Sequence, residues 1–478
     1  MMQRTSAIRT SATALLLIAS AIAHGSPAPR QTPISADAST PARTDMEARV
    51  DALVAQYLEK PGAVGLSIAI ARGGRVVLAK GYGLADAEFD VKADADTLFR
   101  IGSVTKQFTA ALVMRYVEQG KLSLDDDLSK YVPEFPLQGK RVTIRQLLNH
   151  TSGIPSYTDV GEEWQKKWPL DLSHEELLAL VKDKPFDFEP GTKWAYNNTG
   201  YYLLGMVLEK VGGKSYGGLI TGEIAKPLGL TRTRRDSNVE LIKNRAQGYA
   251  LERTPLGSKL VNDQVFGTGQ PGAAGMLLST ARDLVTWQMA LSTGKFVSPE
   301  SYASMRTPTI LPDGKNTGYG FGLMIDDLDG HERVQHGGGI FGFNSMLAWY
   351  PKDDLHVAVI SNGEPLRSDS IADELVWIGL GVERPAVKDE PIPSERLPQL
   401  VGAYDLEGLG LESEVTTEGG KLFLQAKAPG QKKFRLQWQG GEEYRADFDR
   451  NVKVVFSADG RSFQLFQSGG MFQARRKP

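Results

Sequence analysis

Apolar residues recur at helical spacing in four long segments of the chain. The first begins at Asp45, with Thr44 or Asp45 as its N-cap, and the four segments read "DMEARVDALVAQYLEK", "FTAALVMRYVEQG", "TGYYLLGMVLEKVGG" and "TARDLVTWQMALSTG". Runs typical of strands lie before and after the last three helices. An early one predicts a hairpin that turns at Gly73-Gly74, and the late ones are "RVQHGG", "FNSMLAWYP" and "LHVAVISNG". We therefore predict an α/β (α+β) domain in which both chain ends contribute to one antiparallel sheet and a helical region is inserted between them.

The pattern changes after this domain. The stretch "GVERPAVKDEPIPSERLP" is rich in proline and charge, which predicts a linker over residues 386–398. Five short runs between turn residues follow it, namely "KLFLQA", "KFRLQW", "EYRADF", "VKVVFS" and "SFQLFQ". Because 478 residues are many for one core, we expect a large domain over 45–385 and a small all-β, barrel-like domain over 399–478.

The N-terminus is typical of an export signal. Arg4 and Arg9 precede the apolar run "ATALLLIASAIA", which ends in small residues at Ala21-Ile22-Ala23. We predict a signal peptide over residues 1–23 and a protein that is periplasmic or secreted. The alternative is that the segment stays in place as an anchor. Residues 24–44 are rich in Pro, Ser, Thr and Ala, which indicates a flexible linker.

The composition of the chain excludes several classes of partner and of catalytic site. The hydrophobic fraction of 41%, the charged fraction of 23% and the formal charge of -2 are ordinary for a globular protein and favour no nucleic-acid or membrane-surface partner. Because the chain has no cysteine, disulfides, a thiol nucleophile, a thiolate metal site and a lipidated cysteine are excluded. The six histidines show no metal-ligand spacing, so we expect no metal and no organic cofactor. Strand geometry could still bring His331 and His336 together, although ordinary hydrogen-bonded histidines are the simpler interpretation.

One serine stands where a helix is expected to begin. In "FRIGSVTKQFTA" the pattern predicts a helix from Ser103 to about Gln119, and residues three apart share a face, so Lys106 can reach Ser103. A serine hydroxyl needs a base to become a nucleophile, and a lysine serves only if its pKa is lowered. The simpler alternative is that Ser103 only caps the helix and that Lys106 is solvated.

A second serine matches a nucleophile motif in sequence but not in its predicted structural context. The sequence "GKSYG" around Ser215 has the G-x-S-x-G form, but that motif needs a strand before the serine. The preceding segment is helical, with Gly212-Gly213 as its expected C-cap. Leu208 also stands where a phosphate-binding loop has its first glycine. Neither a nucleophile at Ser215 nor nucleotide binding is favoured.

Two further polar clusters need an explanation. Tyr196 and Asn198 lie in a loop just before a predicted helix, where both could face a pocket. His336 precedes Gly337, Gly338 and Gly339 on a strand-like run, and glycine in a strand often marks the close approach of a ligand or another backbone. Taken separately, the clusters could also be a turn and a bulged edge strand.

Taken together and in this order, the three clusters resemble the motifs of a known family. "SVTK", "YNN" and "HGG" are similar to the Ser-x-x-Lys, Tyr-x-Asn and Lys-Thr-Gly or His-x-Gly motifs of the serine β-lactamase, penicillin-binding and DD-peptidase superfamily, in its class C-like branch. The resemblance covers about residues 45–381. It extends to the segments "LLNHTSGIP", "PGTKWAYNNTGYYLLGMVLEKVGGKSY", "GMLLSTARDLVTW" and "YGFGL".

The resemblance implies a role for each residue of the motifs. Ser103 would be the acylated nucleophile, and Lys106 would help to remove its proton. Tyr196 would act as general base and then as acid, with a phenol pKa lowered by nearby positive charge. Asn198 would orient Lys106 and contact the substrate. The triplet from His336 to Gly338 would line the substrate site, and the backbone N–H groups of Ser103 and Gly339 would form the oxyanion hole.

One departure from the motifs affects the substrate. His336 stands where related β-lactamases usually have lysine, so a cation that would hold a carboxylate is replaced by a group that is neutral near pH 7. We therefore expect an exported serine hydrolase that acts on a small ester, amide or D-amino-acid-containing peptide rather than an efficient β-lactamase. The alternatives are a penicillin-binding or peptidoglycan-interacting protein with little turnover, and a protein whose site is vestigial. The small β-domain is expected to pack against the larger domain or to shape the mouth of the pocket.

Overall fold

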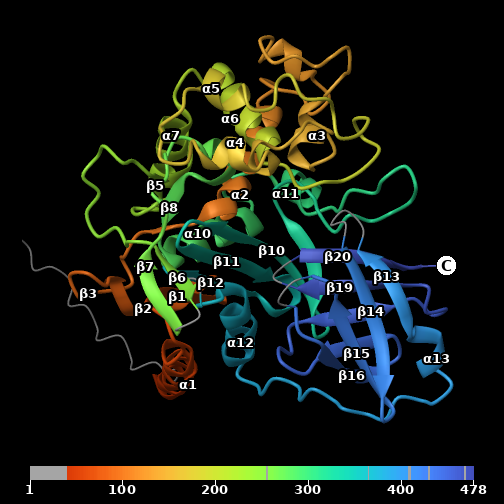
Figure 1. Cartoon of the computed structure of the whole chain (residues 1–478). Helices are drawn as coiled ribbons and strands as arrows, with labels where there is room; N and C mark the ends of the chain where they lie inside the picture. Colours follow the sequence, from red (N-terminus) through yellow and green to blue (C-terminus); the bar gives the residue numbers. More distant parts are fainter. Residues whose placement is uncertain are drawn as a thin grey trace, which may run out of the picture. The chain divides into compact units, whose positions relative to one another are not determined.

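The structure is a computed structural model of the chain. It describes residues 40–254, 257–363, 365–406, 411–428, 431–467 and 470–477. Residues 1–42 and 43–478 form two separate units, and the description below concerns the second. Figure 1 follows its helices and strands along the chain.

A seven-stranded sheet lies at the centre of the larger domain (Figure 1). Its order is β3-β2-β1-β12-β11-β10-β9, and all neighbouring strands are antiparallel. The central pair joins opposite ends of the domain, with Ile68 of β1 opposite Val359 of β12. The strands are β1 (Gly65–Arg72), β2 (Arg75–Asp86), β3 (Val91–Lys92), β9 (Met324–Leu328), β10 (His331–Ile340), β11 (Phe343–Tyr350) and β12 (Leu355–Ser361). The predicted sheet from both ends of the domain is confirmed.

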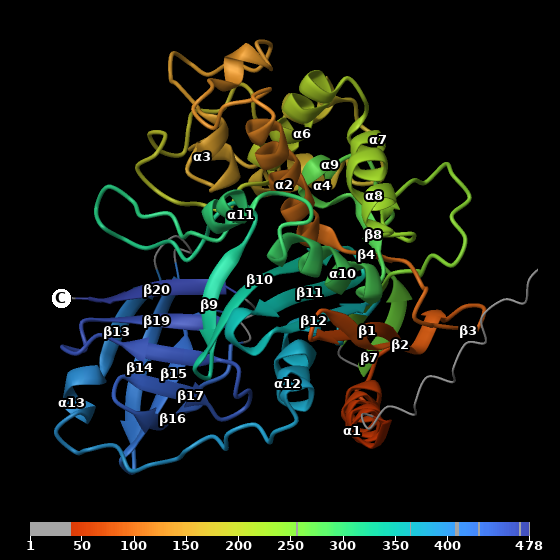
Figure 2. The ribbon, with the colours of Figure 1, turned by 180° about the vertical axis from the view of Figure 1, so that it is seen from behind.

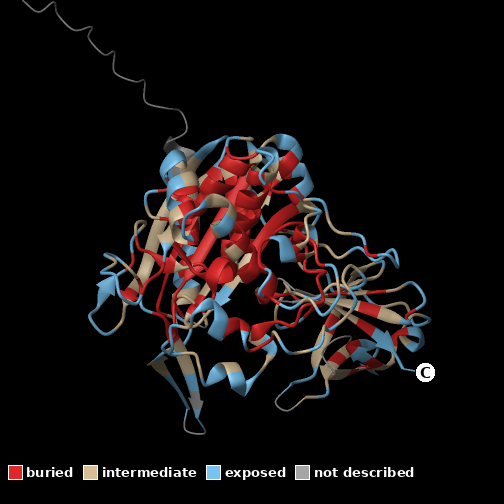
Figure 3. Cartoon of the chain, turned by 90° about the horizontal axis from the view of Figure 1, so that it is seen from above, coloured by how far each residue is buried: buried red, intermediate tan, exposed pale blue. Residues whose placement is uncertain are grey.

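Helices cover both faces of this sheet, as the two opposite views show (Figures 1 and 2). Alternate residues of β1 point to opposite faces. Leu66, Ile68 and Ile70 pack into a core with α1 and α12, whereas Ala69 and Ala71 belong to the core that contains α2 and α10. A strand buried on both sides needs a continuous apolar run rather than alternation, which is what "GLSIAIA" provides. In Figure 3 the buried residues accordingly gather on the sheet and on the helices that cover it.

The helical region is inserted between β3 and β9, and one helix, α12, follows the sheet. The helices of the domain are α1 (Thr40–Leu58), α2 (Thr105–Glu118), α3 (Ile144–Leu148), α4 (Glu162–Gln165), α5 (His174–Leu178), α6 (Asn198–Gly212), α7 (Tyr216–Leu219), α8 (Lys226–Leu228), α9 (Gly272–Gly275), α10 (Ala281–Ser292), α11 (Pro299–Met305) and α12 (Ser368–Leu380). Two small sheets accompany them, made of β4 (Phe99–Arg100), β8 (Leu277–Ser279) and β5 (Arg234–Arg235), and of β6 (Tyr249–Thr254) and β7 (Gly257–Asn262).

The C-terminal segment is a closed eight-stranded barrel, so the predicted all-β domain is also confirmed. A short helix, α13 (Leu397–Leu400), precedes it. Its strands are β13 (Gly402–Leu406), β14 (Leu411–Glu418), β15 (Lys421–Ala426), β16 (Phe434–Gly440), β17 (Glu443–Ala446), β18 (Lys453–Phe456), β19 (Ser462–Gln467) and β20 (Gly470–Arg476). Asp329, in the β9–β10 turn, accepts hydrogen bonds from Arg384 and from Arg445 of β17. The barrel is therefore linked to the seven-stranded sheet by ion pairs.

Two boundaries differ from the sequence prediction. α1 begins at Thr40, so the predicted N-cap at Thr44 or Asp45 is wrong. The helix expected from Ser103 is preceded by a 3-10 turn over Gly102–Val104, and α2 itself begins at Thr105. The predicted signal peptide, residues 1–23, lies outside the described residues. Within the described ranges, each helix is too short or too polar to cross a bilayer.

Candidate active site

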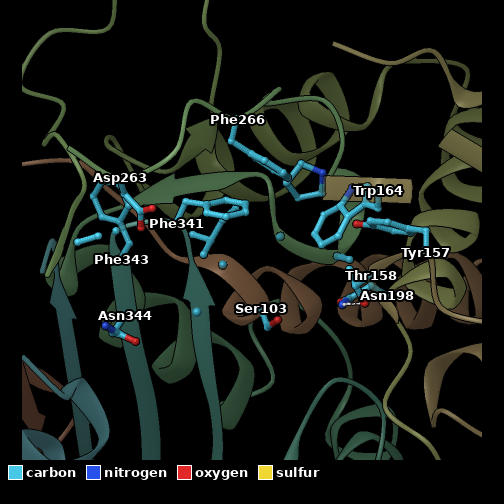
Figure 4. Close-up of a pocket in the computed structure, with 18 residues that line it drawn as sticks. Ser103, Tyr157, Thr158, Trp164, Asn198, Asp263, Phe266, Phe341, Phe343 and Asn344 are labelled. Carbon is cyan, nitrogen blue, oxygen red and sulfur yellow. Dashed lines mark hydrogen bonds between the residues drawn. The ribbon is translucent and has the colours of Figure 1, made fainter. Parts of the chain in front are cut away.

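Ser103 lies in the 3-10 turn between β4 and α2, at the N-terminal end of the buried helix (Figure 4). The turn begins with Gly102 at a φ of +47°, a conformation that glycine adopts readily. Strand β10 passes close beside it, because a Cβ on Gly102 would stand 3.0 Å from the backbone nitrogen and oxygen of Gly339. The glycine therefore brings the serine against the edge of the central sheet.

Lys106 is one helical turn from Ser103 and is completely buried. Its Nζ lies 3.1 Å from Ser103 Oγ, 2.8 Å from Asn198 Oδ1 and 2.9 Å from the backbone oxygen of Ala274. The predicted contact between Lys106 and Ser103 is thus present in the structure. The interpretation of Lys106 as a solvated lysine is wrong.

The surroundings of Lys106 favour an uncharged amine. Burial lowers its pKa well below the ordinary value, and no carboxylate within the described ranges forms an ion pair with it. A neutral amine has two N–H groups and one lone pair. Asn198 Oδ1 and the Ala274 carbonyl can only accept, so they take both N–H groups. The lone pair is left for the hydroxyl proton of Ser103.

Asn198 is held in this orientation by its own neighbours. It is the first residue of α6, whose N-cap is Asn197, and the side chain of Asn197 accepts from the backbone N–H of Gly200. The Asn198 Nδ2 group donates to Thr158 Oγ1 at 3.2 Å, which directs Oδ1 toward Lys106. The "YNN" sequence therefore serves two purposes, because one asparagine caps the helix and the next faces the lysine.

Tyr196 lies on the other side of the same lysine. Lys106 Nζ is 4.7 Å from the centre of the Tyr196 ring. The Tyr196 hydroxyl is buried and has no hydrogen-bond partner within the described part of the chain. Burial raises the pKa of Tyr196 above its usual value, although the nearby Ser103 side chain acts in the opposite direction. The expectation of a lowered phenol pKa is wrong, because Lys106 supplies no permanent charge to offset burial.

The three glycines of the third motif allow β10 to approach the serine. Gly338 pairs with Ser345 of β11, and a Cβ on Gly338 would stand 2.1 Å from the Ile101 oxygen and 3.0 Å from the Ser103 nitrogen. Ser345 Oγ also donates to that Ile101 oxygen at 2.7 Å. The backbones of β10 and of the serine turn are therefore in contact, as predicted for glycine in a strand. The bulge alternative fails because β10 pairs with β11 from Val334 to Ile340 without a register shift. Since β9 pairs with β10 only as far as Gln335, the glycines do lie on a locally open edge, which faces the serine turn.

His336 is buried behind the glycines and does not carry a proton on both nitrogens. Its Nδ1 donates to the Gly337 carbonyl at 2.6 Å, since a carbonyl can only accept, and its Nε2 lies 3.0 Å from the hydroxyl of Tyr319. Burial, together with the nearby Lys106, lowers the pKa of His336 to about 3. The structure thus agrees with a neutral histidine where a lysine would carry charge.

A pocket of about 430 Å³ opens at Ser103 (Figure 4). Asn198 and Gly339 line it with the serine, whereas Lys106, Tyr196, His336 and the other motif glycines do not. The remaining lining residues are Gly102, Tyr157, Thr158, Trp164, Ala250, Asp263, Phe266, Pro271, Ala274, Gly275, Ile340, Phe341, Gly342, Phe343 and Asn344. The pocket thus lies on one side of Ser103, and the side chains of Lys106, Tyr196 and His336 do not reach its surface.

The competing candidates lie elsewhere. Ser215 is the N-cap of α7 and accepts from the Gly218 N–H, after a helix that ends at Gly212 with Gly213 in the left-handed conformation. His331 bonds to Asp353 rather than to His336. Within the described ranges, no cluster of three or more histidine and carboxylate side chains is placed to hold a metal ion.

Several contributors to the site were not predicted from the sequence. The carbonyl of Ala274 acts through the backbone, so its side chain gives no signal. Thr158 and Tyr319 orient Asn198 and His336 across long sequence separations. Tyr319 lies in the "YGFGL" segment that resembles the family, and this resemblance was the one sequence signal that pointed to Tyr319. The aromatic lining of the pocket comes from separate loops and has no local motif.

The chain is similar to known proteins over most of its length. The Beta-lactamase family matches residues 50–380 of the chain. Penicillin-binding protein 4* of Bacillus subtilis is 30% identical over 435 residues, which cover 86% of this chain and 94% of that protein. The octameric penicillin-binding protein homologue of Pyrococcus abyssi superposes with a TM-score of 0.63 at 27% identity over 90% of this chain and all of the other. A D-stereospecific amidohydrolase of Streptomyces sp. gives 0.58 at 29% identity over 70% of this chain and 97% of the other.

Proposed function

This chain belongs to the Beta-lactamase family, and from this premise we propose that it is a serine hydrolase that forms an acyl-enzyme on Ser103. Its substrates are small esters, amides or peptides that contain a D-amino acid. The observation that carries the proposal is the position of Lys106, whose buried Nζ lies 2.8 Å from Asn198 Oδ1, 2.9 Å from the Ala274 oxygen and 3.1 Å from Ser103 Oγ. A buried neutral amine placed in this way is a general base for the serine.

Acylation begins when Ser103 Oγ attacks the carbonyl carbon of the substrate and its proton passes to Lys106 Nζ. The carbonyl oxygen becomes an oxyanion, which the backbone N–H groups of Ser103 and Gly339 stabilise. The close approach of β10 to the serine turn supports this pairing of amides. The Ser103 amide also lies in the 3-10 turn that leads directly into α2, at the end where the helix dipole favours negative charge.

Tyr196 supplies the proton that the leaving group needs. Because burial raises its pKa, the phenol holds its proton at neutral pH and suits the role of acid rather than of initial base. The phenol O–H bond breaks as the leaving amine or alcohol departs, and the proton on Lys106 then returns the tyrosine to its neutral form. In deacylation, water attacks the acyl carbon, the same groups move the proton, and a carboxylic acid leaves.

The substrate class follows from His336 and from the relatives. A buried histidine with a pKa of about 3 supplies no cation for a substrate carboxylate, which disfavours efficient β-lactam hydrolysis. The similarity to a D-stereospecific amidohydrolase supports amides and D-peptides. The second candidate, a penicillin-binding protein with little turnover, is favoured by the similarity to penicillin-binding protein 4* over nearly its whole length.

Covalent labelling tests the proposal. The wild-type protein and Ser103→Ala are treated with a fluorophosphonate and with a penicillin, and the modified peptide is identified by mass spectrometry. We expect label on Ser103 and none in the variant. Label that persists in Ser103→Ala or is found on Ser215 would contradict the assignment. A panel of p-nitrophenyl esters, a chromogenic cephalosporin and D-amino-acid peptides separates the two candidates, because only the penicillin-binding alternative predicts labelling without turnover on all three.

We also propose that the chain is exported and cleaved near Ala23, on the pattern of residues 1–23. The test is expression of the full chain in a Gram-negative host, followed by cell fractionation and N-terminal sequencing. A mature protein that begins just after Ala23 in the periplasm or the medium is expected. A full-length protein that stays with the membrane would instead support the anchor.

A further inference from the structure

The pocket beside Ser103 has a wall of aromatic rings. Phe266 and Phe341 lie 4.7 Å apart between ring centres, and Trp164 is 6.0 Å from Phe266. Figure 4 shows these rings on the side of the pocket away from the ribbon that carries Ser103, with Tyr157 next to Trp164. They come from α4 and from the loops after β7 and β10. A wall of this kind buries an apolar or aromatic group of the substrate.

The same pocket contains one charged side chain. Among its lining residues Asp263 alone carries a formal charge at neutral pH, and no lysine, arginine or histidine lines it. One carboxylate oxygen of Asp263 accepts from the backbone N–H of Gln264. Within the described part of the chain, no cation forms an ion pair with it. Figure 4 places Asp263 and Asn344 at the opposite end of the pocket from Trp164 and Tyr157.

The position of Asp263 is set by the backbone. Its N–H donates to the carbonyl of Gly248 at 3.1 Å, just after the last paired residue of the β6–β7 hairpin. Gly248 itself lies against Phe343, since a Cβ there would stand 2.6 Å from the Phe343 ring. The carboxylate is therefore carried by a hairpin that packs on the strand following the glycine motif, and it faces the pocket from a fixed point.

We propose that this pocket selects substrates whose acyl part combines an aromatic or bulky apolar group with a cationic amine, and that Asp263 binds the amine. The inference rests on the proposed function and adds the substrate class. The pocket receives the acyl part because Ser103 and Asn198 line it, whereas Tyr196, which protonates the leaving group, does not. An anionic acyl group would meet an unbalanced carboxylate, and an ammonium ion would be attracted to both the carboxylate and the ring faces.

Matched pairs of p-nitrophenyl esters test the proposal. In the first pair, para-(aminomethyl)phenylacetate is compared with para-ethylphenylacetate, which has the same shape without the charge. In the second pair, the phenylalanine ester, whose amine lies next to the carbonyl, is compared with the hydrocinnamate ester, which has the same acyl group without the amine. The assays are run at about pH 7, where an α-amine is largely protonated. In the wild type, kcat/KM for the charged member of at least one pair should exceed that of the neutral member by roughly five- to tenfold, as one half-buried ion pair can supply.

The variant Asp263→Asn should abolish this preference, so that the charged and the neutral member of each pair are hydrolysed with equal kcat/KM. Glu252→Gln, which removes the same charge from β6 outside the pocket, is the matched control and should keep the preference. In Asp263→Lys the preference should reverse in favour of a carboxylate-bearing ester. Equal rates for both members of both pairs, or a preference that survives in Asp263→Asn, would overturn the inference. Loss of neutral-ester hydrolysis in Ser103→Ala tests the proposed function separately, because that result does not depend on the ratio.

Discussion

The hydroxyl of Tyr319 lies 3.0 Å from Nε2 of His336, and both side chains are buried. The carbonyl of Gly337 occupies the other ring nitrogen. The imidazole is therefore closed to substrate on both polar atoms. At the third motif His336 therefore fills space as a neutral side chain and supplies no charge.

His336 should remain neutral throughout the range in which a free histidine titrates. Since burial lowers its pKa to about 3, its ¹⁵N signals should not change between about pH 5 and pH 8. The signals are assigned by comparison with His336→Gln. Because the unfolded chain takes up this proton near pH 6.5 and the folded chain does not, the residue lowers stability as the pH falls from about 6.5 toward 3. The Gln variant should lose less stability on acidification, and a titration near pH 6.5 would contradict this account.

Lys106→Met should remove activity and change the pH dependence of stability. We expect kcat/KM to fall by at least roughly 10³-fold, since the base is lost. The pKa of Lys106 is lowered on folding, so the unfolded chain binds one more proton between that pKa and about 10.4, and stability of the wild type rises with pH in this window. The variant should lose this contribution, up to about 1.4 kcal/mol per pH unit, in urea unfolding. Identical slopes for the two proteins would mean that Lys106 is charged in the folded state.

Tyr196→Phe should affect amides more than activated esters. An amide leaving group needs a proton from Tyr196, whereas p-nitrophenolate leaves without one, so kcat/KM should fall by roughly 10²–10⁴-fold for a D-amino-acid amide and much less for the p-nitrophenyl ester. Thermal unfolding should hardly change, because the Tyr196 hydroxyl has no hydrogen-bond partner in the described ranges. An equal loss on both substrates would show that the tyrosine acts before the leaving group departs.

Gly338→Ala and Gly339→Ala form a matched pair on one strand. A Cβ on Gly338 would clash with the Ile101 oxygen at 2.1 Å, so the variant should lose about 2 kcal/mol or more of unfolding free energy and most of its acylation rate. A Cβ on Gly339 has open space within 4 Å. That variant should keep its thermal stability and change only its substrate preference, because the residue lines the pocket. Similar melting temperatures for the two variants would contradict the close approach described here.

Local patterns predicted most of the elements but fewer of their boundaries. The Gly73-Gly74 turn and the apolar runs around it led directly to the β1–β2 hairpin, in which Arg72 pairs with Arg75. The short strands β3, β4 and β5 are each two residues long, so they carry no periodicity. β9, "MIDDL", is polar because Asp326 forms an ion pair with Arg333 of β10, so its strand character depends on its partner. Such tertiary pairing cannot be found in one stretch of sequence.

The site was predictable where it consists of side chains in ordered motifs. Ser103, Lys106, Tyr196 and Asn198 come together in the structure as the resemblance implied, while their catalytic roles stay predictions. The Tyr196 pKa was predicted in the wrong direction, because the extent of burial around the phenol depends on packing among residues far apart in sequence. The Asp263 end of the pocket was missed for a similar reason, since the hairpin that carries it approaches Phe343 only in the folded domain.

The pairing of β1 with β12 also determines when the larger domain can assemble. The serine turn and α2 follow within a few dozen residues of β1, yet β10, β11 and β12, which complete the sheet under the nucleophile, end only at Ser361 of 478 residues. A ribosome must therefore release about three quarters of the chain before the sheet can close, and such long-range pairing slows folding. Until then the nascent polypeptide carries Ser103 and Lys106 without Gly339. An incomplete chain therefore lacks one of the two backbone amides that we propose for the oxyanion hole.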